Sequence, residues 1–354
     1  MTNSHFGRSL AFIVALWIFP ASAWIAARHV CLLSRYSTTA GPQFRALFEQ
    51  LVEQSLGVPN IAARVALIPT AAYCEYGENP ESRSNARADA ESDAARLCAD
   101  LGLASCDILE LDAFDADPLG LRSAVKAIDP HVVWVTGGNT FYLRHFMRTS
   151  GFDKLAKELC APATGRRALV YVGQSAGSIC GAASTDIAHF KGWDDPAKAP
   201  ESVLPYGLRL AGEDISIFPH YSKEKGHDEL ISIQSKSFGL DTSENHQVLR
   251  LRDDQAFVWS QTAGDTSGTG VATSFTFCSD GSLENLCYPP PLPPLAPPPL
   301  HETAPDIAAA FYRGGAVVGG VPCTGEPAID PSRLVQRGDS EWFEEGSPVG
   351  EPQV

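Results

Sequence analysis

Positive charge is scarce in this sequence. Its 354 residues include 27 lysines and arginines against 42 aspartates and glutamates, so the formal net charge at pH 7 is −15. A surface with this balance repels the phosphates of nucleic acids and the headgroups of anionic membranes. We therefore expect neither nucleic acid nor a membrane surface as a partner, and we interpret the acidity as an aid to solubility.

Cysteine pairs at the spacing of metal ligands are absent. The sequence has nine cysteines, and no two of them form a C-x-x-C pair. Such pairs are the usual sign of a structural zinc site, so the sequence indicates no metal. If the chain is secreted, Cys278 and Cys287 are able to form a disulfide, because they flank a predicted hairpin turn at residues 279–282.

The apolar run near the N-terminus is too short to span a membrane, because it extends only from Leu10 to Phe19. Arg8 precedes this run, and Pro20 and the small-x-small sequence Ala21-Ser22-Ala23 follow it. A basic residue, a short apolar core and small residues at a cleavage point are typical of a signal peptide. We therefore predict a signal peptide over residues 1–23 and a location in the secretory pathway or outside the cell.

Two other interpretations of this N-terminal segment stay open. Apolar residues continue to Ala27, so an uncleaved signal anchor that holds the protein at a membrane is one alternative. The other is a plastid location, because Ala-Ser-Ala followed by Trp24 resembles the bipartite plastid signals of algae with secondary plastids. The first predicted strand near His29 leaves little room for the transit peptide that such a signal needs.

The sequence does contain a regular alternation of apolar runs with segments of helical spacing. Hydrophobic residues make up 44% of the chain, which is enough for one large α/β domain or two small ones. The alternation predicts an α/β fold, in which helices flank a doubly wound, mainly parallel sheet. Predicted strands cover 29–34, 63–69, 106–111, 131–135, 168–172, 215–218, 247–251 and 256–260, and predicted helices cover 42–56, 86–101, 119–128, 142–149, 152–160 and 228–237.

The composition changes after residue 287. Residues 29–287 are predicted to form the globular domain, and residues 288–305 a proline-rich spacer, because 288–300 are mostly proline and leucine. Residues 306–354 then form a C-terminal extension. Its segment 306–320 is predicted to be ordered, and its acidic end, 341–354, is predicted to be disordered.

The strand at 168–172 leads into a turn suited to hold a nucleophile. Residues 173–177 are Gly-Gln-Ser-Ala-Gly, the G-x-S-x-G pattern of a nucleophile elbow, a sharp turn from strand to helix that carries a serine. Small neighbours are needed because the backbone of such a turn is strained and crowds the strand. Ser175 is therefore the candidate nucleophile, and the N–H of Ala176 is a candidate donor to an oxyanion. A second glycine-rich turn, at 136–141, follows another parallel strand and should reach the same edge of the sheet.

A nucleophilic serine needs a general base and an acid that orients the base. Among nine histidines, His220 is the best candidate base, because it follows the predicted strand at 215–218 and would project at the edge of the sheet. Two pairs of carboxylates are candidates for the acid: Asp253 and Asp254, which follow another strand, and Asp194 and Asp195, on the loop beyond the elbow. With Asp253 the chain order is Ser, His, acid, which differs from the α/β-hydrolases and matches class I glutamine amidotransferase-like folds.

Three motifs resemble the peptidase E family, the serine peptidases that include aspartyl dipeptidase and cyanophycinase. They are VTGGNTFYL at 135–143, YVGQSAGS at 171–178 and FPHY at 218–221, and the start HVCLLSRYSTTAG at 29–41 resembles the family's first strand and loop. The resemblance covers roughly residues 29–260. It implies a flavodoxin-like three-layer sandwich of the class I glutamine amidotransferase-like type.

The resemblance also implies the catalytic roles. Ser175 would be the nucleophile and His220 the base, with Phe218 where the family usually has asparagine. Asp253 matches the acid of the family's L-x-E-G motif, although aspartate is one methylene shorter than glutamate. Asp194 matches a loop aspartate that has also been considered in that family.

Further site residues follow from the same motifs. Gly138, in the second glycine-rich turn, would supply the second oxyanion N–H beside that of Ala176. Asn139 in that turn and His227 in the stretch after the histidine are further candidates for contact with the substrate. The stretch from Gly226 lacks the arginine with which aspartyl dipeptidases bind an aspartyl carboxylate. The residue expected to bind the carboxylate of an N-terminal aspartate is therefore missing, unless a nearby cation replaces it. The candidates for this replacement are Arg209, Arg144 and Lys223.

We therefore predict a serine-type peptidase that hydrolyses small peptides as a dipeptidase or a related exopeptidase, with no metal and no cofactor. A glutaminase-type subunit is disfavoured, because its nucleophile would be a cysteine where this chain has Ser175. The alternatives are a cyanophycinase-like hydrolase, for which an acidic surface would suit basic side chains, and a non-catalytic binding protein on the same fold. The sequence is also compatible with an oligomer.

Overall fold

The computed structural model describes residues 27–56, 62–76, 80–161, 168–201, 205–240, 246–262, 272–284, 334–336 and 342–344. The chain divides into two compact units, Met1–Pro294 and Leu295–Val354. The predicted signal peptide, the proline-rich segment and the segment 306–320 lie outside the described residues, as does Cys287, the predicted disulfide partner of Cys278.

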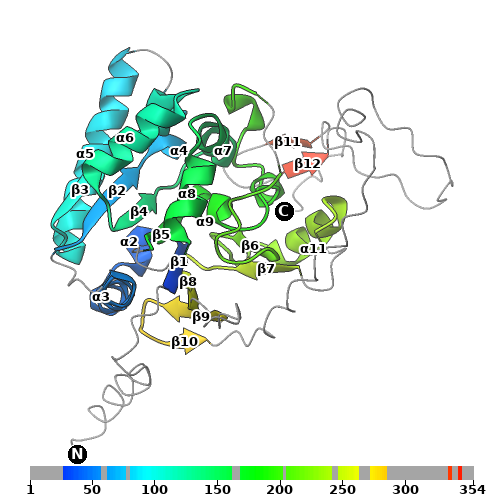
Figure 1. The fold of residues 1–354 in the computed structure, drawn as a ribbon. Coiled ribbons are helices and arrows are strands. Elements are labelled where there is room, and N and C mark those ends of the chain that lie inside the picture. Colours follow the sequence, from blue (N-terminus) through cyan, green and yellow to red (C-terminus); the bar gives the residue numbers. More distant parts are fainter. Residues whose placement is uncertain are drawn as a thin grey trace, which may run out of the picture. The chain divides into compact units, whose positions relative to one another are not determined.

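The first unit is built around an eight-stranded sheet with the strand order β10-β9-β8-β1-β5-β4-β2-β3 (Figure 1). Five neighbouring strands are parallel: β1 (Ala27–Leu33), β5 (Val170–Gln174), β4 (Val132–Val135), β2 (Arg64–Ile68) and β3 (Ser105–Ile108). Three antiparallel strands continue the sheet beyond β1: β8 (Gln255–Thr262), β9 (Ala272–Cys278) and β10 (Leu283–Glu284). The predicted mainly parallel sheet is confirmed.

Helices cover both faces of this sheet. One face packs against α3 (Pro42–Leu56) and α5 (Pro80–Leu101), and the other against α6 (Pro118–Ile128), α7 (Thr140–Thr149), α8 (Phe152–Cys160) and α9 (Ala176–Gly181). Side chains alternate between the faces along each strand. On β4, Val132 and Trp134 pack in the apolar cluster on the side of α3 and α5. Val133 and Val135 pack in the cluster on the side of α6, α7, α8 and α9. The result is the predicted α/β arrangement of helix, sheet and helix layers.

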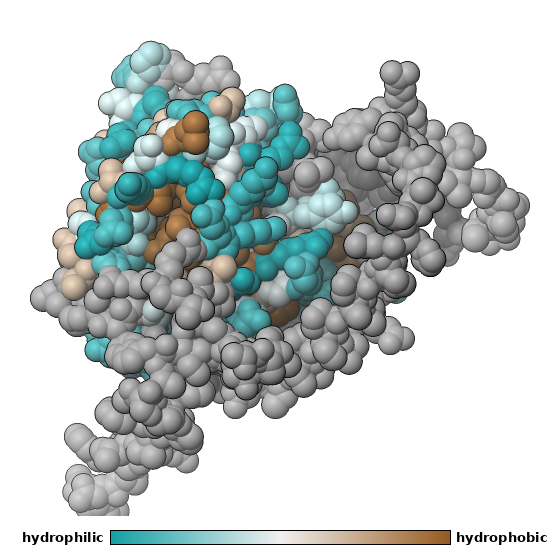
Figure 2. Space-filling model, viewed as in Figure 1, coloured by the Kyte–Doolittle hydropathy of each residue, from teal (hydrophilic) through white to brown (hydrophobic). Residues whose placement is uncertain are grey.

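Shorter helical segments connect these layers: α2 (Tyr36–Thr39), α4 (Thr70–Tyr73), η2 (Leu111–Phe114), α10 (Ile187–Phe190) and η3 (Pro196–Lys198). On the face shown in Figure 2, hydrophilic residues cover most of the described surface and apolar residues appear in small patches. Within the described part of the chain, no helix combines the length and the apolar character that crossing a membrane requires.

A separate two-stranded sheet follows the elbow. It pairs β6 (Ile215–Phe218) with β7 (Gln247–Arg250) in parallel, and α11 (His227–Ser237) lies between them in the sequence. Both strands were predicted, but the structure places β6 in this separate sheet and not in the main one. In the main sheet, the strand that pairs with β1 on the side away from β5 is β8.

The small sheet is nevertheless held close to the end of β1. The chain passes from β7 into β8 within four residues, and the N–H of Ser34, just after β1, donates to the carbonyl of Gln255 at 3.1 Å. The N–H of Leu251 donates to the carbonyl of Phe218 at 3.0 Å. These bonds bring the ends of β1, β6 and β7 together, which places three distant parts of the sequence around one site.

Two boundaries differ from the prediction. α5 begins at Pro80, whereas the sequence predicted a start near residue 86. The prediction missed the first turns of this helix because they are polar and carry no apolar periodicity. In the second unit, β11 (Leu334–Gln336) pairs antiparallel with β12 (Trp342–Glu344). β12 lies in the end that was predicted to be disordered, and its aromatic residues Trp342 and Phe343 are types that favour strands.

Candidate active site

Ser175 lies in a strained turn between β5 and α9. Its backbone has φ 49° and ψ −110°, a conformation that non-glycine residues rarely adopt. The flanking glycines have no room for a side chain: a Cβ on Gly173 would lie 2.5 Å from the carbonyl oxygen of Gly177, and one on Gly177 would lie 2.3 Å from that of Val135. The small residues of the pattern are therefore required by packing, and the turn projects the serine hydroxyl away from the strand.

His220 reaches this hydroxyl from the end of β6. Its Nε2 lies 2.9 Å from Ser175 Oγ. Like the serine, it has a positive φ, here 54°. Its N–H donates to Ser34 Oγ at 2.7 Å, so the end of β1 holds its main chain.

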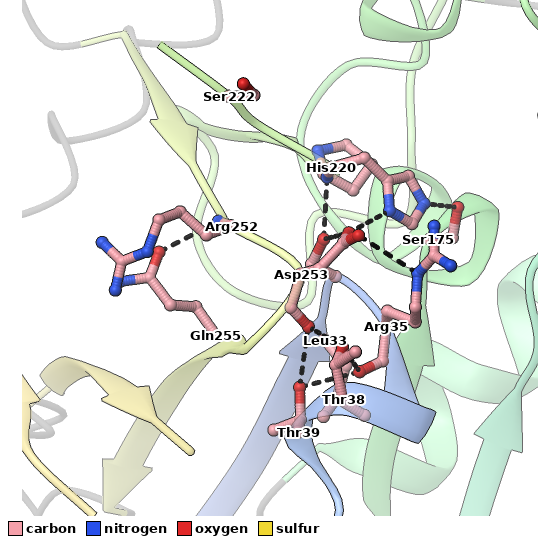
Figure 3. A network of polar contacts seen from close by, with 12 residues as sticks. Leu33, Arg35, Thr38, Thr39, Ser175, His220, Ser222, Arg252, Asp253 and Gln255 are labelled. Atoms are coloured by element: carbon pink, nitrogen blue, oxygen red, sulfur yellow. Dashed lines mark hydrogen bonds and ion pairs between the residues drawn. The ribbon is translucent and has the colours of Figure 1, made fainter. Parts of the chain in front are cut away.

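Asp253 contacts the other nitrogen of the imidazole. Its Oδ1 lies 2.5 Å from His220 Nδ1, and it follows β7 in the short turn that leads into β8 (Figure 3). Ser34 Oγ donates to the same carboxylate oxygen at 3.3 Å, and Arg35 Nε lies 3.3 Å from Oδ2. Thr38 and Thr39 donate their hydroxyls to the Asp253 carbonyl oxygen. The loop after β1 therefore fixes both the carboxylate and the main chain of this acid.

The charges around the imidazole shift its pKa in opposite directions. Burial lowers the pKa of His220, the hydrogen bond and charge of Asp253 raise it, and Lys191 and Arg35 lower it; the net direction is downward. Partial burial acts to raise the pKa of Asp253, but His220, Arg35 and Ser34 outweigh it and leave the pKa lowered. His220 is thus neutral and Asp253 ionised near neutral pH, which is the pair of states that general-base catalysis needs.

Asp194, the other candidate acid, lies elsewhere. Its Oδ2 accepts the N–H of Thr140 at the start of α7 at 3.0 Å. Burial is the main cause that raises its pKa. It lines the pocket beside Ser175, whereas the carboxylate that contacts His220 in the described structure is that of Asp253.

The second glycine-rich turn meets the elbow at the carboxyl ends of neighbouring strands, β4 and β5. A Cβ on Gly137 would lie 3.1 Å from that of Ser175, so the two turns are in contact. Gly138 has φ 133° and lies against the main chain of Ala71, where a Cβ would come within 2.3 Å. The structure thus places Gly138 in the turn that touches Ser175, and Ala176 directly after it at the start of α9.

Asn139 and His227 occupy different positions from the other predicted site residues. Asn139 caps α7 by accepting the N–H of Tyr142 at 2.9 Å, and its amide donates to the carbonyl of Asp195 at 3.0 Å. His227 begins α11, and its Nδ1 accepts the N–H of Ser222 at 3.0 Å. Both side chains are buried and neither lines the pocket. Their contacts hold loops of the site in place.

A pocket opens beside the serine. Its lining consists of Ser175, Ile179, Ile187, Ala188, Lys191, Trp193, Asp194, Phe218, Pro219 and His220. None of the three cations named as replacements for the missing arginine lines it. Arg144 is buried and donates to the carbonyl of Tyr206, and Arg209 pairs with Glu213. Among the residues that the structure describes, no three histidine, cysteine, aspartate or glutamate side chains form a group that could hold a metal ion.

Sequence reasoning missed three residues of this site: Ser34, Arg35 and Lys191. The first two lie in the stretch 29–41 that was matched only as a first strand and loop. Lys191 follows α10 and lines the pocket; it lies three residues before Asp194, and the motif matched at that loop does not include it. The only signal for the first two was their place after a buried parallel strand, where loops of such sheets form sites.

Comparisons with known proteins bear on this region. The model of peptidase family S51 matches residues 31–265. The uncharacterized peptidase Lin0382 of Listeria innocua serovar 6a is 31% identical over 151 residues, which are 42% of this chain and 67% of that protein. The uncharacterized peptidase Lmo0363 of Listeria monocytogenes serovar 1/2a is 36% identical over 90 residues, which are 25% of this chain and 40% of that protein.

A solved structure, described as a peptidase E protein from Listeria monocytogenes EGD-e, is similar with a TM-score of 0.43 and 23% identity. The similarity covers 72% of this chain and 99% of that one. The family match at 31–265 includes both glycine-rich turns, the histidine at the end of β6 and both candidate acids.

Proposed function

The chain belongs to peptidase family S51 and is a serine peptidase, and from this premise we propose that it hydrolyses small peptides, as a dipeptidase or related exopeptidase, through a Ser175–His220–Asp253 triad. One observation carries the proposal. Ser175 Oγ, the two nitrogens of the imidazole and Asp253 Oδ1 form one continuous chain of contacts of 2.9 and 2.5 Å. This is the geometry of a nucleophile, a base and an orienting acid.

The mechanism follows from these positions. Ser175 Oγ attacks the scissile carbonyl carbon while His220 Nε2 takes the hydroxyl proton. Asp253 keeps the imidazole proton on Nδ1 and stabilises the imidazolium that forms. The N–H groups of Gly138 and Ala176 hold the negative oxygen of the tetrahedral intermediate. His220 then gives its proton to the leaving amine, and water releases the acyl group by the same steps in reverse.

The pocket supports a short substrate. Its lining includes the buried apolar side chains of Ile179, Ile187 and Phe218. A substrate in this pocket would pack against them, and their bulk limits the space for a longer peptide. The described lining contains no arginine, so we do not extend the proposal to a preference for an N-terminal aspartate.

Hydrolysis of a dipeptide library by the purified protein tests this proposal. We expect free amino acids to be released from a subset of dipeptides. Ser175→Ala should lower kcat/KM by at least about 10³-fold, because removal of a triad nucleophile leaves only binding and the oxyanion donors. Ser222→Ala is the matched control, because Ser222 is a nearby serine whose hydroxyl bonds Glu224 and not the imidazole.

Three results would contradict the proposal. Release of amino acids that persists in Ser175→Ala would exclude Ser175 as the nucleophile. Activity on an aspartyl–arginine polymer with none on dipeptides would favour the cyanophycinase-like alternative. A folded protein that cleaves neither substrate would favour the non-catalytic alternative. The contact between Ser175 Oγ and His220 Nε2 argues against that alternative.

A further inference from the structure

Lys191 lies in the pocket, and the proposed triad mechanism leaves it without a role. It follows α10, and its Nζ donates to the carbonyl oxygens of Pro219 at 2.5 Å and His220 at 3.0 Å. The same nitrogen lies 4.1 Å from the centre of the Phe218 ring and 4.2 Å from that of Trp193. The ammonium is therefore aimed at the main chain of the segment that carries the base.

The main chain at His220 needs such support. A non-glycine residue at φ 54° is disfavoured and persists only where its surroundings hold it. On one side, the N–H of His220 donates to Ser34 Oγ. On the other side, its carbonyl accepts from Lys191. These two bonds clamp the conformation from which the imidazole reaches Ser175.

The charge of Lys191 also lowers the pKa of the His220 imidazole. The pKa of Lys191 is lowered to about 7. Burial is the largest cause and lowers it, Asp253 and Asp194 raise it, and Lys225 lowers it. In the acidic range where His220 titrates, Lys191 is therefore protonated. Two positive charges so close repel each other, so the ammonium disfavours protonation of the imidazole.

Other charged groups act on the same imidazole. Asp253 favours its protonation, and Arg35 opposes it as Lys191 does. Lys191 also acts on a second histidine. Burial is the largest cause that lowers the pKa of His227, and Lys191 and Lys225 lower it further. A variant at Lys191 therefore changes one of several charges around the base, and its effect is measurable only against a control of equal charge change.

We infer that Lys191 is a positioning residue of this peptidase, whose ammonium clamps the main chain of His220 and places its positive charge next to that residue. The inference rests on the proposed triad, in which His220 is the base. It joins His220, which lies in the motif at 218–221, to Lys191, which lies outside the motifs and 29 residues earlier in the sequence.

Two variants separate the clamp from the charge. Lys191→Met removes both, and Lys191→Gln keeps an N–H donor while it removes the charge. We expect Lys191→Met to lower kcat roughly tenfold with KM changed less than about twofold, because the base is misplaced and not the substrate. Both variants should move the acid limb of the kcat/KM profile upward by about half a pH unit, because a neighbouring cation has gone. Lys236→Met, on the exposed face of α11, should leave profile and kcat as in the wild type.

An NMR titration of the imidazole gives a readout that needs no activity. The His220 signal is the one lost in His220→Ala, and its midpoint should rise in Lys191→Met and Lys191→Gln but not in Lys236→Met. If Lys191→Met does not fold, the midpoint in Lys191→Gln decides the charge effect. An unchanged midpoint in folded variants overturns the inference, as does a rise in KM alone, which would make Lys191 a substrate ligand. A wild type without Ser175-dependent hydrolysis would instead refute the proposed function, and the titration would still decide the role of Lys191.

Discussion

Replacement of Asp253 by asparagine separates the two acids that the sequence left open. In a buried Ser-His-Asp triad, loss of the acid's charge lowers kcat by about 10⁴-fold. Here the Asp253 side chain is 41% exposed, so water screens part of its charge on the imidazolium. We therefore expect kcat/KM to fall by about 10²–10³-fold, which is about 3–4 kcal/mol at 1.36 kcal/mol for each tenfold change.

Asp194→Asn is the matched control. Its amide oxygen is able to accept the N–H of Thr140 as the carboxylate does, so we expect a loss in kcat/KM of less than about tenfold. Both variants are assayed on the best dipeptide, with thermal unfolding to verify that each is folded. A larger loss in Asp194→Asn than in Asp253→Asn would refute the assignment of the acid and the reasoning from the 2.5 Å contact.

Three further predictions follow from the site. Ser34→Ala should lower kcat and reduce stability by about 1–3 kcal/mol, because its buried hydroxyl bridges the His220 N–H and the Asp253 carboxylate; kinetics and urea unfolding measure both. The acid limb of kcat/KM should have its midpoint below about 6.5, the ordinary pKa of histidine, because the pKa of His220 is lowered and the neutral base persists to lower pH; a midpoint above 6.5 would contradict this. Gly177→Ala should destabilise by about 1–3 kcal/mol, because its Cβ would meet the carbonyl of Val135; an unchanged urea midpoint would refute the packing argument.

The fold could be predicted to the extent that it is encoded in local patterns. The bounds of α3 and α8 match the predicted 42–56 and 152–160, because apolar residues at helical spacing continue to both ends of these helices. β6 was predicted at its correct residues, but its place in a separate sheet was not. Which strand a segment pairs with depends on long-range contacts, here the ladder between β1 and β8. The spacing of apolar residues within one segment does not indicate such contacts.

The site shows the same division. The elbow around Ser175 is a local feature, so its pattern and small residues could be recognised directly. The choice between Asp253 and Asp194 required the positions of two loops, and both fitted a motif. Ser34 and Lys191 lie far from His220 in the sequence and contact it only through the fold, so the sequence contained no spacing that would indicate them.

Asn139 has a structural role that the sequence analysis did not assign to it. Its place in the G-G-N-T turn predicts contact with the substrate, and in the structure its side chain caps α7 and holds the loop at Asp195. Asparagine is among the preferred N-cap residues, and a helix directly follows this turn. The physical signal for a cap was therefore present in the sequence beside the functional motif.

If Ser175 is a nucleophile activated by His220, a fluorophosphonate should react with it. We would label the full chain and identify the modified peptide by mass spectrometry. We expect one covalent adduct on Ser175 in the wild type, no adduct at that position in Ser175→Ala, and labelling slowed by at least about 10²-fold in His220→Ala. An adduct on another serine, or equal labelling rates in the wild type and His220→Ala, would contradict this expectation.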